Sequence, residues 1–544
     1  MLINIGAHQR SSAVRVGPKV RGASVIVAGA SIIVASLGAV ALPAQAATAA
    51  RSDTNLSLHI KDTAGMSGEN YIVTVARGVS ASSSMLGQPV VANLDGPAFH
   101  GAVVRLSESA ARELANKPGI SSVERDAKVS VAGTGTGTGT GKDVPPGVDP
   151  DHLNRAIPVG PSAASMANSW GLDRTDQQRL PLDGDYSPAG HGAGVDAFVI
   201  DTGIALDSPD FAGRIGFGGY TVGTGVDDCN GHGTHVSGTI GSNVTGMADQ
   251  VVIHPVRVLD CSGQGYTSDV IEAMNWVATN APSQSVVNMS LGGSYSPSEN
   301  SAAANMVSNG LVVAVAAGNS ASDACDYSPA SEPSLLTVGA IDSTDSDTSY
   351  SNAGPCLDLY APGTDILSTG LSPGSYATMS GTSMASPHVA GAAAVYWSLN
   401  PEASSAAVSQ AVLSQSTPGI INYPYGQAGS PNQLLNVQWS GGPPGTPGRP
   451  STRSMSKSRV RVAWGASTAN GNPVTYILQA RLGAKGRWKR VAITAATSWA
   501  GKVRGARRGS VIFFRVIATS SAGASRPSPA SRARMRAASG SPTS

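Results

Sequence analysis

Long apolar runs are scarce in this sequence of 544 residues. After residue 42 no stretch reaches the roughly 20 apolar residues that a bilayer-spanning helix needs, so no second membrane span is expected. Cysteine is rare as well, and the four cysteines, all within 229–356, allow three pairings. Acidic residues are absent from 441–544, which carries 19 Lys and Arg, whereas 142–440 carries 27 Asp and Glu against 6 Lys and Arg. The two regions must therefore have different surfaces and different partners.

The one long apolar run, from Ala23 to Leu42, lies near the N-terminus and follows four basic residues. Ala44-Gln45-Ala46 then offers small residues at the two positions that a signal peptidase reads. The pattern predicts a cleaved secretory signal and a secreted, extracellular protein in which disulfides can form. An uncleaved membrane anchor is the alternative, because the run is long enough to span a bilayer.

A chain of this length is too long for one hydrophobic core, and its pattern changes along its length. Residues 70–131 read as a small α+β unit, and a Gly-Thr run at 133–141 follows as a flexible spacer. From about Trp170, short apolar strands alternate with helices, which indicates an α/β domain with a parallel sheet. Its predicted strands are 195–200, 252–258, 285–289, 311–316 and 335–341, and its predicted helices are 232–242, 268–279, 302–309 and 383–399. After a Pro/Gly linker, short strands at 459–464, 474–480, 488–493 and 512–519 predict a β-sandwich.

Three motifs carry the chemistry, in the order Asp, His, Ser: Val199-Ile-Asp-Thr-Gly203, Asn230-Gly-His-Gly-Thr-His-Val-Ser-Gly238 and Ser380-Gly-Thr-Ser-Met-Ala-Ser-Pro-His-Val-Ala-Gly391. Asp201 ends an apolar strand, at the edge of a parallel sheet where α/β sites form. His232 lies between two glycines at the start of a helix. Ser383 opens a long apolar helix, whose N-terminus favours negative charge. Together the three residues predict a nucleophilic triad.

Each motif taken singly has another interpretation. Asp-Thr-Gly is often only a turn, and a serine before a helix is often only a cap. His232 and His235 are a candidate metal pair, although no further ligand follows at a known spacing. A fourth element favours the triad: the apolar stretch Leu311–Asn319 ends in an amide at the same sheet edge. Asn319 Nδ2 and the Ser383 backbone N–H are candidates to hold the oxyanion of a tetrahedral intermediate, with Asn319 as a turn residue the alternative.

Across about 168–440 these motifs resemble the subtilase superfamily, and most closely its proteinase K and aqualysin branch. Trp170–Gln177 resembles the start of mature enzymes in that branch. Residues 70–131 resemble the family's inhibitory propeptide, with Tyr71-Ile-Val at the front and Val123-Glu-Arg-Asp126 near the end. The last region resembles a fibronectin type III module at Trp464, Tyr476, Phe514-Arg-Val516 and Gly523–Ser528, but Ile512 stands where that family has a tyrosine.

The resemblance implies a parallel-sheet subtilisin-like catalytic domain of the α/β class, with a small α+β propeptide and a C-terminal β-sandwich. The expected segments are a signal peptide at 1–46, an inhibitory propeptide at 47–132, a processing region at 133–167, the peptidase domain at 168–440, a linker at 441–450, a fibronectin type III-like domain at 451–535 and a disordered tail at 536–544.

The resemblance also implies roles for individual residues. The aqualysin pattern pairs Cys229 with Cys261 and Cys325 with Cys356, with free thiols as the alternative. An extended substrate would lie along main chain at Gly263, Gly265, Ser290, Leu291, Gly292, Gly293, Ala317 and Gly318. A calcium site like that of proteinase K would use the carbonyls of Pro333 and Leu335 with the Asp358 carboxylate.

The sequence thus predicts a secreted, monomeric serine endopeptidase that is self-processed from a zymogen and acts through an acyl-enzyme, without a catalytic cofactor. The apolar Ala316-Ala-Gly318 predicts a preference for aromatic or aliphatic residues before the cleaved bond, and the propeptide is the expected inhibitor. A catalytically silent binding protein and a membrane-anchored surface protease are the alternatives.

For the basic C-terminal region three roles stay open: a spacer, a binder of an external polyanion, and a module that docks on its own acidic catalytic domain. No base-reading motif indicates specific nucleic-acid binding.

Overall fold

The computed structural model describes residues 54–55, 68–82, 86–131, 156–159, 169–426, 429–439 and, with short gaps, 447–534. The predicted signal peptide, most of the predicted processing region and the predicted tail lie outside these residues. Within the described chain, no helix combines the length and hydropathy needed to cross a membrane.

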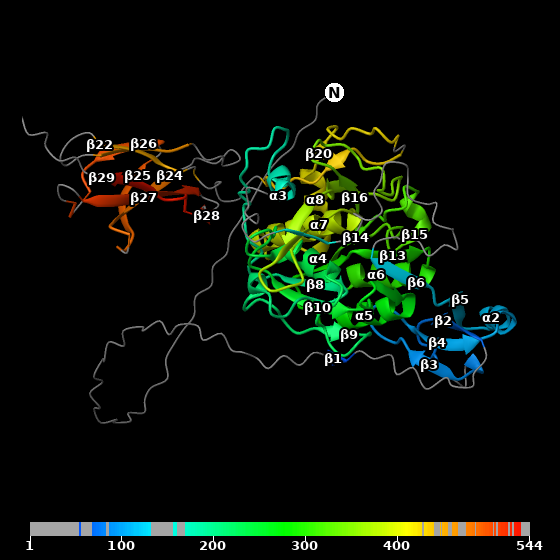
Figure 1. The fold of residues 1–544 in the computed structure, drawn as a ribbon. Helices are drawn as coiled ribbons and strands as arrows, with labels where there is room; N and C mark the ends of the chain where they lie inside the picture. The colour runs from blue at the N-terminus through cyan, green and yellow to red at the C-terminus, as the bar shows by residue number, and fades with distance from the viewer. Residues whose placement is uncertain are drawn as a thin grey trace, which may run out of the picture. The chain divides into compact units, whose positions relative to one another are not determined.

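The centre of the molecule is a sheet of ten strands in the described chain, in the order β1-β9-β10-β8-β12-β14-β16-β17-β21-β20 (Figure 1). All neighbours except β20 and β21 run parallel. The strands are β1 (Thr54–Asn55), β8 (Asp196–Asp201), β9 (Gly219–Tyr220), β10 (Val252–Arg257), β12 (Ser285–Met289), β14 (Val312–Ala316), β16 (Leu336–Ile341), β17 (Leu359–Pro362), β20 (Thr417–Pro418) and β21 (Gln433–Leu434). The predicted α/β class is confirmed.

Helices cover both faces of this sheet. They are α3 (Trp170–Thr175), α4 (His232–Gly241), α5 (Thr267–Asn280), α6 (Pro297–Ser308), α7 (Thr382–Leu399) and α8 (Ser405–Gln415). Successive residues of β8 point to opposite faces: Ala197 and Val199 pack in the core that contains α4, α7 and α8, and Phe198 and Ile200 in the core that contains α5 and α6. The strands are therefore apolar on both sides, as expected for a buried parallel sheet.

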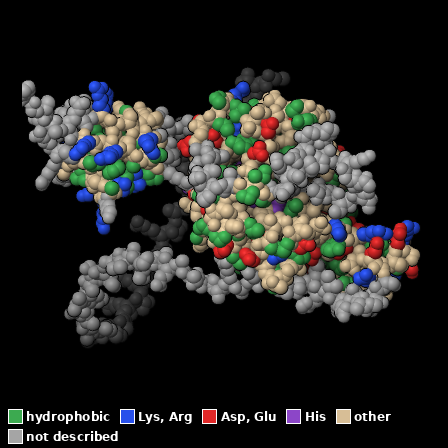
Figure 2. All heavy atoms as spheres, viewed as in Figure 1, with side chains coloured by type: hydrophobic (Ala, Val, Ile, Leu, Met, Phe, Trp, Pro, Cys, Tyr) green, Lys and Arg blue, Asp and Glu red, His purple; other side chains and the backbone are tan. Residues whose placement is uncertain are grey.

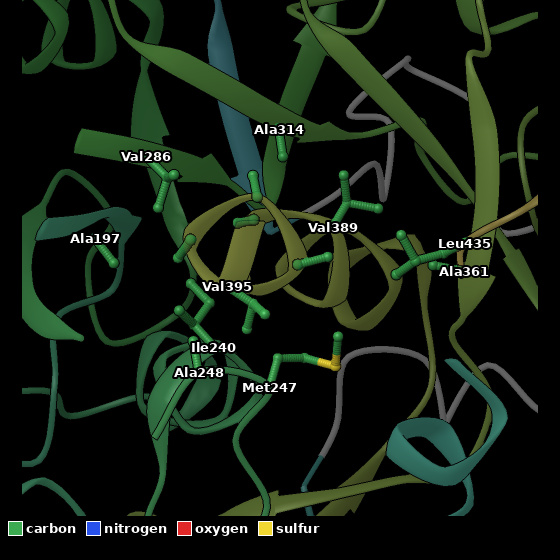
Figure 3. Packing of buried hydrophobic residues seen from close by; sticks show 14 of the residues in the cluster. Ala197, Ile240, Met247, Ala248, Val286, Ala314, Ala361, Val389, Val395 and Leu435 are labelled. Atoms are coloured by element: carbon green, nitrogen blue, oxygen red, sulfur yellow. The ribbon is translucent and has the colours of Figure 1, made fainter. Parts of the chain in front are cut away.

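Helix α7 is buried on every side over its first fourteen residues. Val389 and Val395 lie in one core with Ile240 and Met247 from the α4 segment and with strand residues such as Ala314 (Figure 3). Six of its first fourteen residues are Ala or Gly, so neighbouring elements can approach its axis closely. This packing fixes the position of its N-terminus beneath the ends of the strands.

Residues 69–131, called here the N-terminal unit, form their own sheet in the order β3-β4-β2-β5. Its elements are β2 (Glu69–Val75), β3 (Val90–Asn93), β4 (Gly101–Leu106), α2 (Glu108–Ala115) and β5 (Ile120–Arg125). One face of this sheet, through Ile72 and Val103, shares the core of α5 and α6. The last strand, β6 (Lys128–Val131), leaves this sheet and joins the rest of the protein.

Residues 447–534, called here the C-terminal module, are built from antiparallel strands. One sheet holds β22 (Ser451–Ser454), β23 (Val460–Ala463) and β26 (Ser498–Gly501), and the other holds β24 (Thr475–Leu482), β25 (Lys489–Thr494), β27 (Val511–Ser520), β28 (Gly523–Ala524) and β29 (Ser531–Arg534). The two sheets share one core, in which the Trp464 and Tyr476 rings lie 5.7 Å apart and Ile512 is fully buried.

Two local expectations differ from the structure. Helix α6 begins at Pro297 rather than at 302, because Ser296 accepts a hydrogen bond from Glu299 N and Pro297 occupies the first turn. Residues 133–167 were expected to be a flexible linker and processing region, yet Ile157–Val159 forms strand β7 and pairs with β19 (Tyr376–Met379), next to β18 (Ile366–Thr369).

Candidate active site

Asp201 and His232 form a buried hydrogen-bonded pair. Asp201 is the last residue of β8 and His232 the first of α4, and the distance from His232 Nδ1 to Asp201 Oδ1 is 2.8 Å. Neither side chain is exposed to solvent. Since an ionised carboxylate only accepts, Nδ1 carries the proton and Nε2 keeps its lone pair. Nε2 is buried and has no hydrogen-bond partner among the described residues, so it is the nitrogen available for proton transfer.

Gly233 permits the close approach of α4 to the end of β8. Its N–H donates to Thr202 Oγ1 at 2.8 Å, and a Cβ at this position would lie 2.3 Å from the Gly203 carbonyl oxygen. No side chain fits in that space. The glycine next to the histidine in the sequence is therefore a condition for the Asp201–His232 distance.

Asp228, which the sequence analysis did not single out, holds the start of α4. Its Oδ1 accepts from Asn230 N and Gly231 N, and its Oδ2 accepts from Thr234 N and Thr234 Oγ1 at 2.6 Å. These bonds satisfy amide groups that a helix N-terminus leaves unpaired. An Asp four residues before the histidine was the available signal, since Asp is a preferred helix cap.

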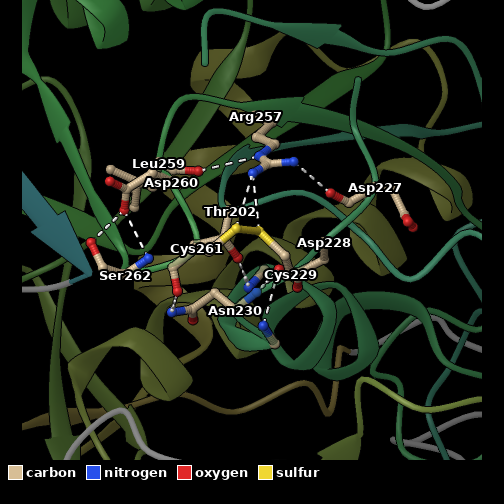
Figure 4. The surroundings of a disulfide bond; sticks show 12 residues. Thr202, Asp227, Asp228, Cys229, Asn230, Arg257, Leu259, Asp260, Cys261 and Ser262 are labelled. Atoms are coloured by element: carbon tan, nitrogen blue, oxygen red, sulfur yellow. Dashed lines mark hydrogen bonds between the residues drawn. A yellow bond between two sulfur atoms is a disulfide. The ribbon is translucent and has the colours of Figure 1, made fainter. Parts of the chain in front are cut away.

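A disulfide constrains the same loop, which precedes α4. Cys229 is bonded to Cys261, and Cys325 to Cys356, which are the pairings that the resemblance implies. Figure 4 shows Arg257 beside the first bond, where it donates to Cys229 Sγ at 3.0 Å and to the Asp227 carbonyl at 2.8 Å.

Ser383 is the second residue of α7 and is fully buried. Its hydroxyl donates to the Ser290 carbonyl at 3.3 Å, and Ser290 Oγ donates to the Ser383 carbonyl at 2.8 Å. Helices α4 and α7 pack against each other. Asp201 is thus hydrogen-bonded to His232, but Ser383 is not hydrogen-bonded to His232 in this structure. The predicted triad requires that second hydrogen bond during proton transfer.

Asn319 follows β14 and reaches the same helix start. Its Oδ1 accepts from Thr382 N and from Thr382 Oγ1, both at 2.9 Å. Because Thr382 holds Oδ1, the Nδ2 of the same amide points away from Thr382. The Ser383 N–H lies in the first turn of α7, where amides have no partner within the helix. Gly318 has a left-handed φ of 102°, and a Cβ there would lie 2.4 Å from Asn352 Nδ2.

The predicted substrate-binding stretches are strand edges, and a segment of the same chain lies between them. Strand β6 pairs antiparallel with β11 (Gln264–Tyr266) on one side and with β13 (Leu291–Ser294) on the other. The Val131 N–H donates to the Gly263 carbonyl at 3.0 Å, and Val131 lies opposite Leu291, the neighbour of Ser290. The glycines allow this approach: Gly293 lies against the Lys128 carbonyl, where a Cβ would be 3.1 Å away.

The residues proposed for calcium lie around the starts of β16 and β17. Asp358 N donates to the Thr337 carbonyl at 3.0 Å, and Asp358 Oδ2 accepts from Thr337 N at 2.8 Å, two residues beyond Leu335. Burial raises the pKa of Asp358 to about 6. Carboxylate and main-chain carbonyl oxygens are ligands of the kind that a hard cation prefers.

Residues 192–435 match the model of the subtilase family. An extracellular serine proteinase from Thermus sp. (strain Rt41A) is 50% identical over 278 residues, which are 50% of this chain and 67% of that protein. Alkaline serine exoprotease A from Vibrio alginolyticus is 45% identical over 315 residues, 56% of this chain and 58% of the relative. A solved structure, titled as a cold adapted subtilisin-like serine proteinase, is 46% identical, covers 50% of this chain and 98% of that one, and has a TM-score of 0.48.

The fold and the buried carboxylate–imidazole pair agree with a peptide hydrolase. On the family match and the identity to the relatives, the chain belongs to the subtilase family and is a serine-type peptidase.

Gly233→Ala tests the close approach of α4 to β8. The added methyl group has to push α4 away from Gly203, so we expect kcat/KM on a peptide substrate to fall by about 10²-fold, because a displacement of about 1 Å in a catalytic group has that effect. Gly225→Ala is the matched control, since a Cβ there has no atom within 4 Å. Wild-type kcat/KM in Gly233→Ala would show that the approach does not position His232.

Proposed function

We propose that this protein is a secreted serine endopeptidase that cleaves peptide bonds with Asp201, His232 and Ser383, self-processed from a zymogen. The observation that carries the proposal is the buried hydrogen bond between Asp201 and His232, next to a helix that begins at Ser383. The extracellular proteinases among its relatives and the N-terminal apolar run support secretion.

In the proposed reaction, Ser383 Oγ turns from the Ser290 carbonyl to His232 Nε2, gives up its proton and attacks the substrate carbonyl. Asp201 keeps the imidazole in the required tautomer and stabilises the imidazolium. Asn319 Nδ2 and the Ser383 N–H donate hydrogen bonds to the oxyanion. His232 then protonates the leaving amine, and water hydrolyses the acyl-enzyme through the same groups.

Ser383→Ala should abolish proteolysis, with turnover lower by about 10⁶-fold on the precedent of subtilisin. The measurement is turnover of a peptide substrate, with Ser386→Ala as the control, because Ser386 lies one turn further along α7 and bonds Asn288 instead. Residual turnover near the wild-type value in Ser383→Ala would end the assignment.

We further propose that the N-terminal unit is an inhibitory propeptide, cut by the site that it blocks. Strand β6 occupies both edges at which an extended substrate would pair, and Val131 lies one register step from Ser290. Self-processing should therefore release a new N-terminus at or next to residue 133. Mass spectrometry of the secreted protein locates that end, and Ser383→Ala should remain uncut.

Carboxyl groups of the N-terminal unit support this role at two helix starts. Glu124 Oε1 accepts from Ser296 Oγ at 3.0 Å and from Ser298 N at 3.1 Å, before α6. Asp126 accepts from Ser268 N at 3.0 Å and from Ser268 Oγ at 2.7 Å, at the start of α5. Each carboxylate therefore lies where the helix dipole favours a negative charge.

Each of these carboxylates also faces an acidic side chain. Glu299 is fully buried, its two carboxyl oxygens have no hydrogen-bond partner among the described residues, and burial with the nearby Glu124 raises its pKa to about 8. Burial and the nearby Asp126 raise the pKa of Asp269 to about 7, and burial raises the pKa of Asp126. The charges of Glu124 and Asp126 act on Glu299 and Asp269 only in the complex, so the complex binds protons more strongly than its separated parts, and its stability falls as pH rises through about 7 to 8.

The processed complex should consequently release active enzyme sooner at alkaline pH. Glu299→Gln keeps a neutral side chain at every pH. At pH 9 we therefore expect the lag before activity to lengthen by about tenfold for each unit by which the complex raises the pKa of Glu299, with no change at pH 6. Glu402→Gln, at an exposed carboxyl, is the control. An equal lag in Glu299→Gln and wild type at pH 9 would contradict the role of this pair.

We also propose a structural calcium ion held by the carbonyls of Pro333 and Leu335 and the Asp358 carboxylate, and no cofactor for catalysis. Millimolar calcium should then raise Tm, with about 2.7 kcal/mol of stabilisation at 100-fold excess over Kd. The effect should vanish in Asp358→Asn and weaken as pH falls, because protons compete with calcium for the Asp358 carboxylate, whose pKa burial raises. A Tm that does not respond to calcium would remove the ion from the proposal.

The substrate preference and the branch remain part of the proposal. Ala317 is fully buried beside Gly318, and these apolar residues suit an aromatic or aliphatic side chain before the cleaved bond. The paired disulfides support the proteinase K and aqualysin branch. The shared core of the two C-terminal sheets supports a fibronectin type III-like module.

A further inference from the structure

The C-terminal module has a hollow of about 500 Å³ lined by cations. We call it the basic hollow, and its charged residues are Arg481, Arg487, Lys489, Arg490 and Lys502. Lys and Arg gather on the visible face of this module (Figure 2). No acidic residue occurs anywhere in 441–544, so the module itself supplies no carboxylate to balance them.

Aromatic rings stack on two guanidinium groups of the module, and one of these groups belongs to Arg481, which lines the hollow. The Arg481 Cζ lies 4.6 Å from the centre of the Trp488 ring and 5.2 Å from that of Phe513, and the Arg515 Cζ lies 4.5 Å from the Trp488 ring. Arg515 Nε donates to Gln479 Oε1 at 2.7 Å, whereas Arg481 Nε is buried without a partner among the described residues. Burial and the neighbouring charge of Arg481 lower the pKa of Arg515. Two guanidinium groups thus share one indole and have no counterion there.

We infer that the basic hollow binds the sulfate or phosphate groups of an acidic glycan. An oxyanion placed among these side chains removes the repulsion between like charges and gives the guanidinium of Arg481 a hydrogen-bond partner. The volume lies within the range of small-ligand sites, so it accommodates one or two substituted sugar units. The net charge of the region alone would attract anions to its whole surface. The hollow instead predicts one localised anion-binding site.

The same geometry disfavours nucleic acid. Single-stranded nucleic acid is bound through aromatic side chains on which the bases stack. Here guanidinium groups lie over the Trp488 ring and the Phe513 ring. The described part of the module consists of strands and turns, with no helix that could enter the major groove of a duplex.

Binding at the basic hollow would hold the peptidase on acidic extracellular surfaces. That consequence rests on the proposed secretion, but the binding does not depend on the peptidase activity. The peptidase proposal and the glycan-binding proposal can therefore be contradicted independently. Peptide hydrolysis tests the first and glycan binding the second, both on the same full-length chain.

The test compares two triple variants of the full chain that lose the same charge. The first, Arg487→Gln/Lys489→Gln/Lys502→Gln, removes exposed cations from the hollow. The second, Arg453→Gln/Arg461→Gln/Arg532→Gln, removes exposed cations of β22, β23 and β29 outside it. Peptide hydrolysis should be unchanged in both, which shows that each variant is folded and active.

Binding is measured to heparin, to a phosphorylated mannan and to duplex DNA of equal charge, across a salt series. The hollow variant should bind the glycans at least about tenfold more weakly, with a log Kd against log salt slope smaller by about 2 to 3, because each lost ionic contact removes about one. The control variant should change Kd by less than about threefold. The heparin and mannan arms distinguish sulfate from phosphate.

An equal loss of glycan affinity in the two triple variants would show that net charge alone accounts for the binding, and it would overturn the inference. Tighter binding to DNA than to both glycans would assign the surface to nucleic acid instead.

Discussion

The burial of helix α7 is the constraint on which the proposed active site depends. Fourteen consecutive residues from Thr382 to Val395 are buried, and the helix packs against β12, β14, β16, β17 and α4. A helix enclosed in this way has no freedom to slide, so its first turn meets the ends of the strands at a fixed place. Ser290 follows β12 and bonds the Ser383 carbonyl, while Asn319 follows β14 and bonds Thr382. The proposed nucleophile and the proposed oxyanion donors are thus positioned by the core itself.

The histidine depends on a second close approach, of α4 to the end of β8. Gly233 removes the side chain that would prevent it, Asp228 satisfies the first amides of α4, and Cys229 ties the loop to Cys261. These contacts are independent of α7, yet α4 also packs against α7. The burial of α7 and the approach of α4 to β8 therefore together position the residues of the proposed active site. Near the same place, strand β6 lies between β11 and β13 and pairs with both.

Much of this arrangement could be predicted from the sequence, because continuous apolar runs and glycine-flanked polar residues are local signals. The strands β8, β10, β12, β14 and β16 and the helices α4, α5 and α7 begin within one residue of their predicted starts. The start of α6 was missed, since Ser296 and Pro297 act through capping and not through apolar spacing. The pairing of Ile157–Val159 and the buried Glu299 could not be predicted, because each depends on residues far away in the chain. The role of Asp228 was missed although its partners Asn230, Gly231 and Thr234 are close in the sequence.

The central claim is that Ser383 is the nucleophile that His232 activates. A fluorophosphonate probe reacts with a serine whose hydroxyl is activated in this way, and peptide mapping by mass spectrometry locates the adduct. The account predicts one adduct, on Ser383. An adduct on another serine, or none on a protein that hydrolyses peptides, would contradict it.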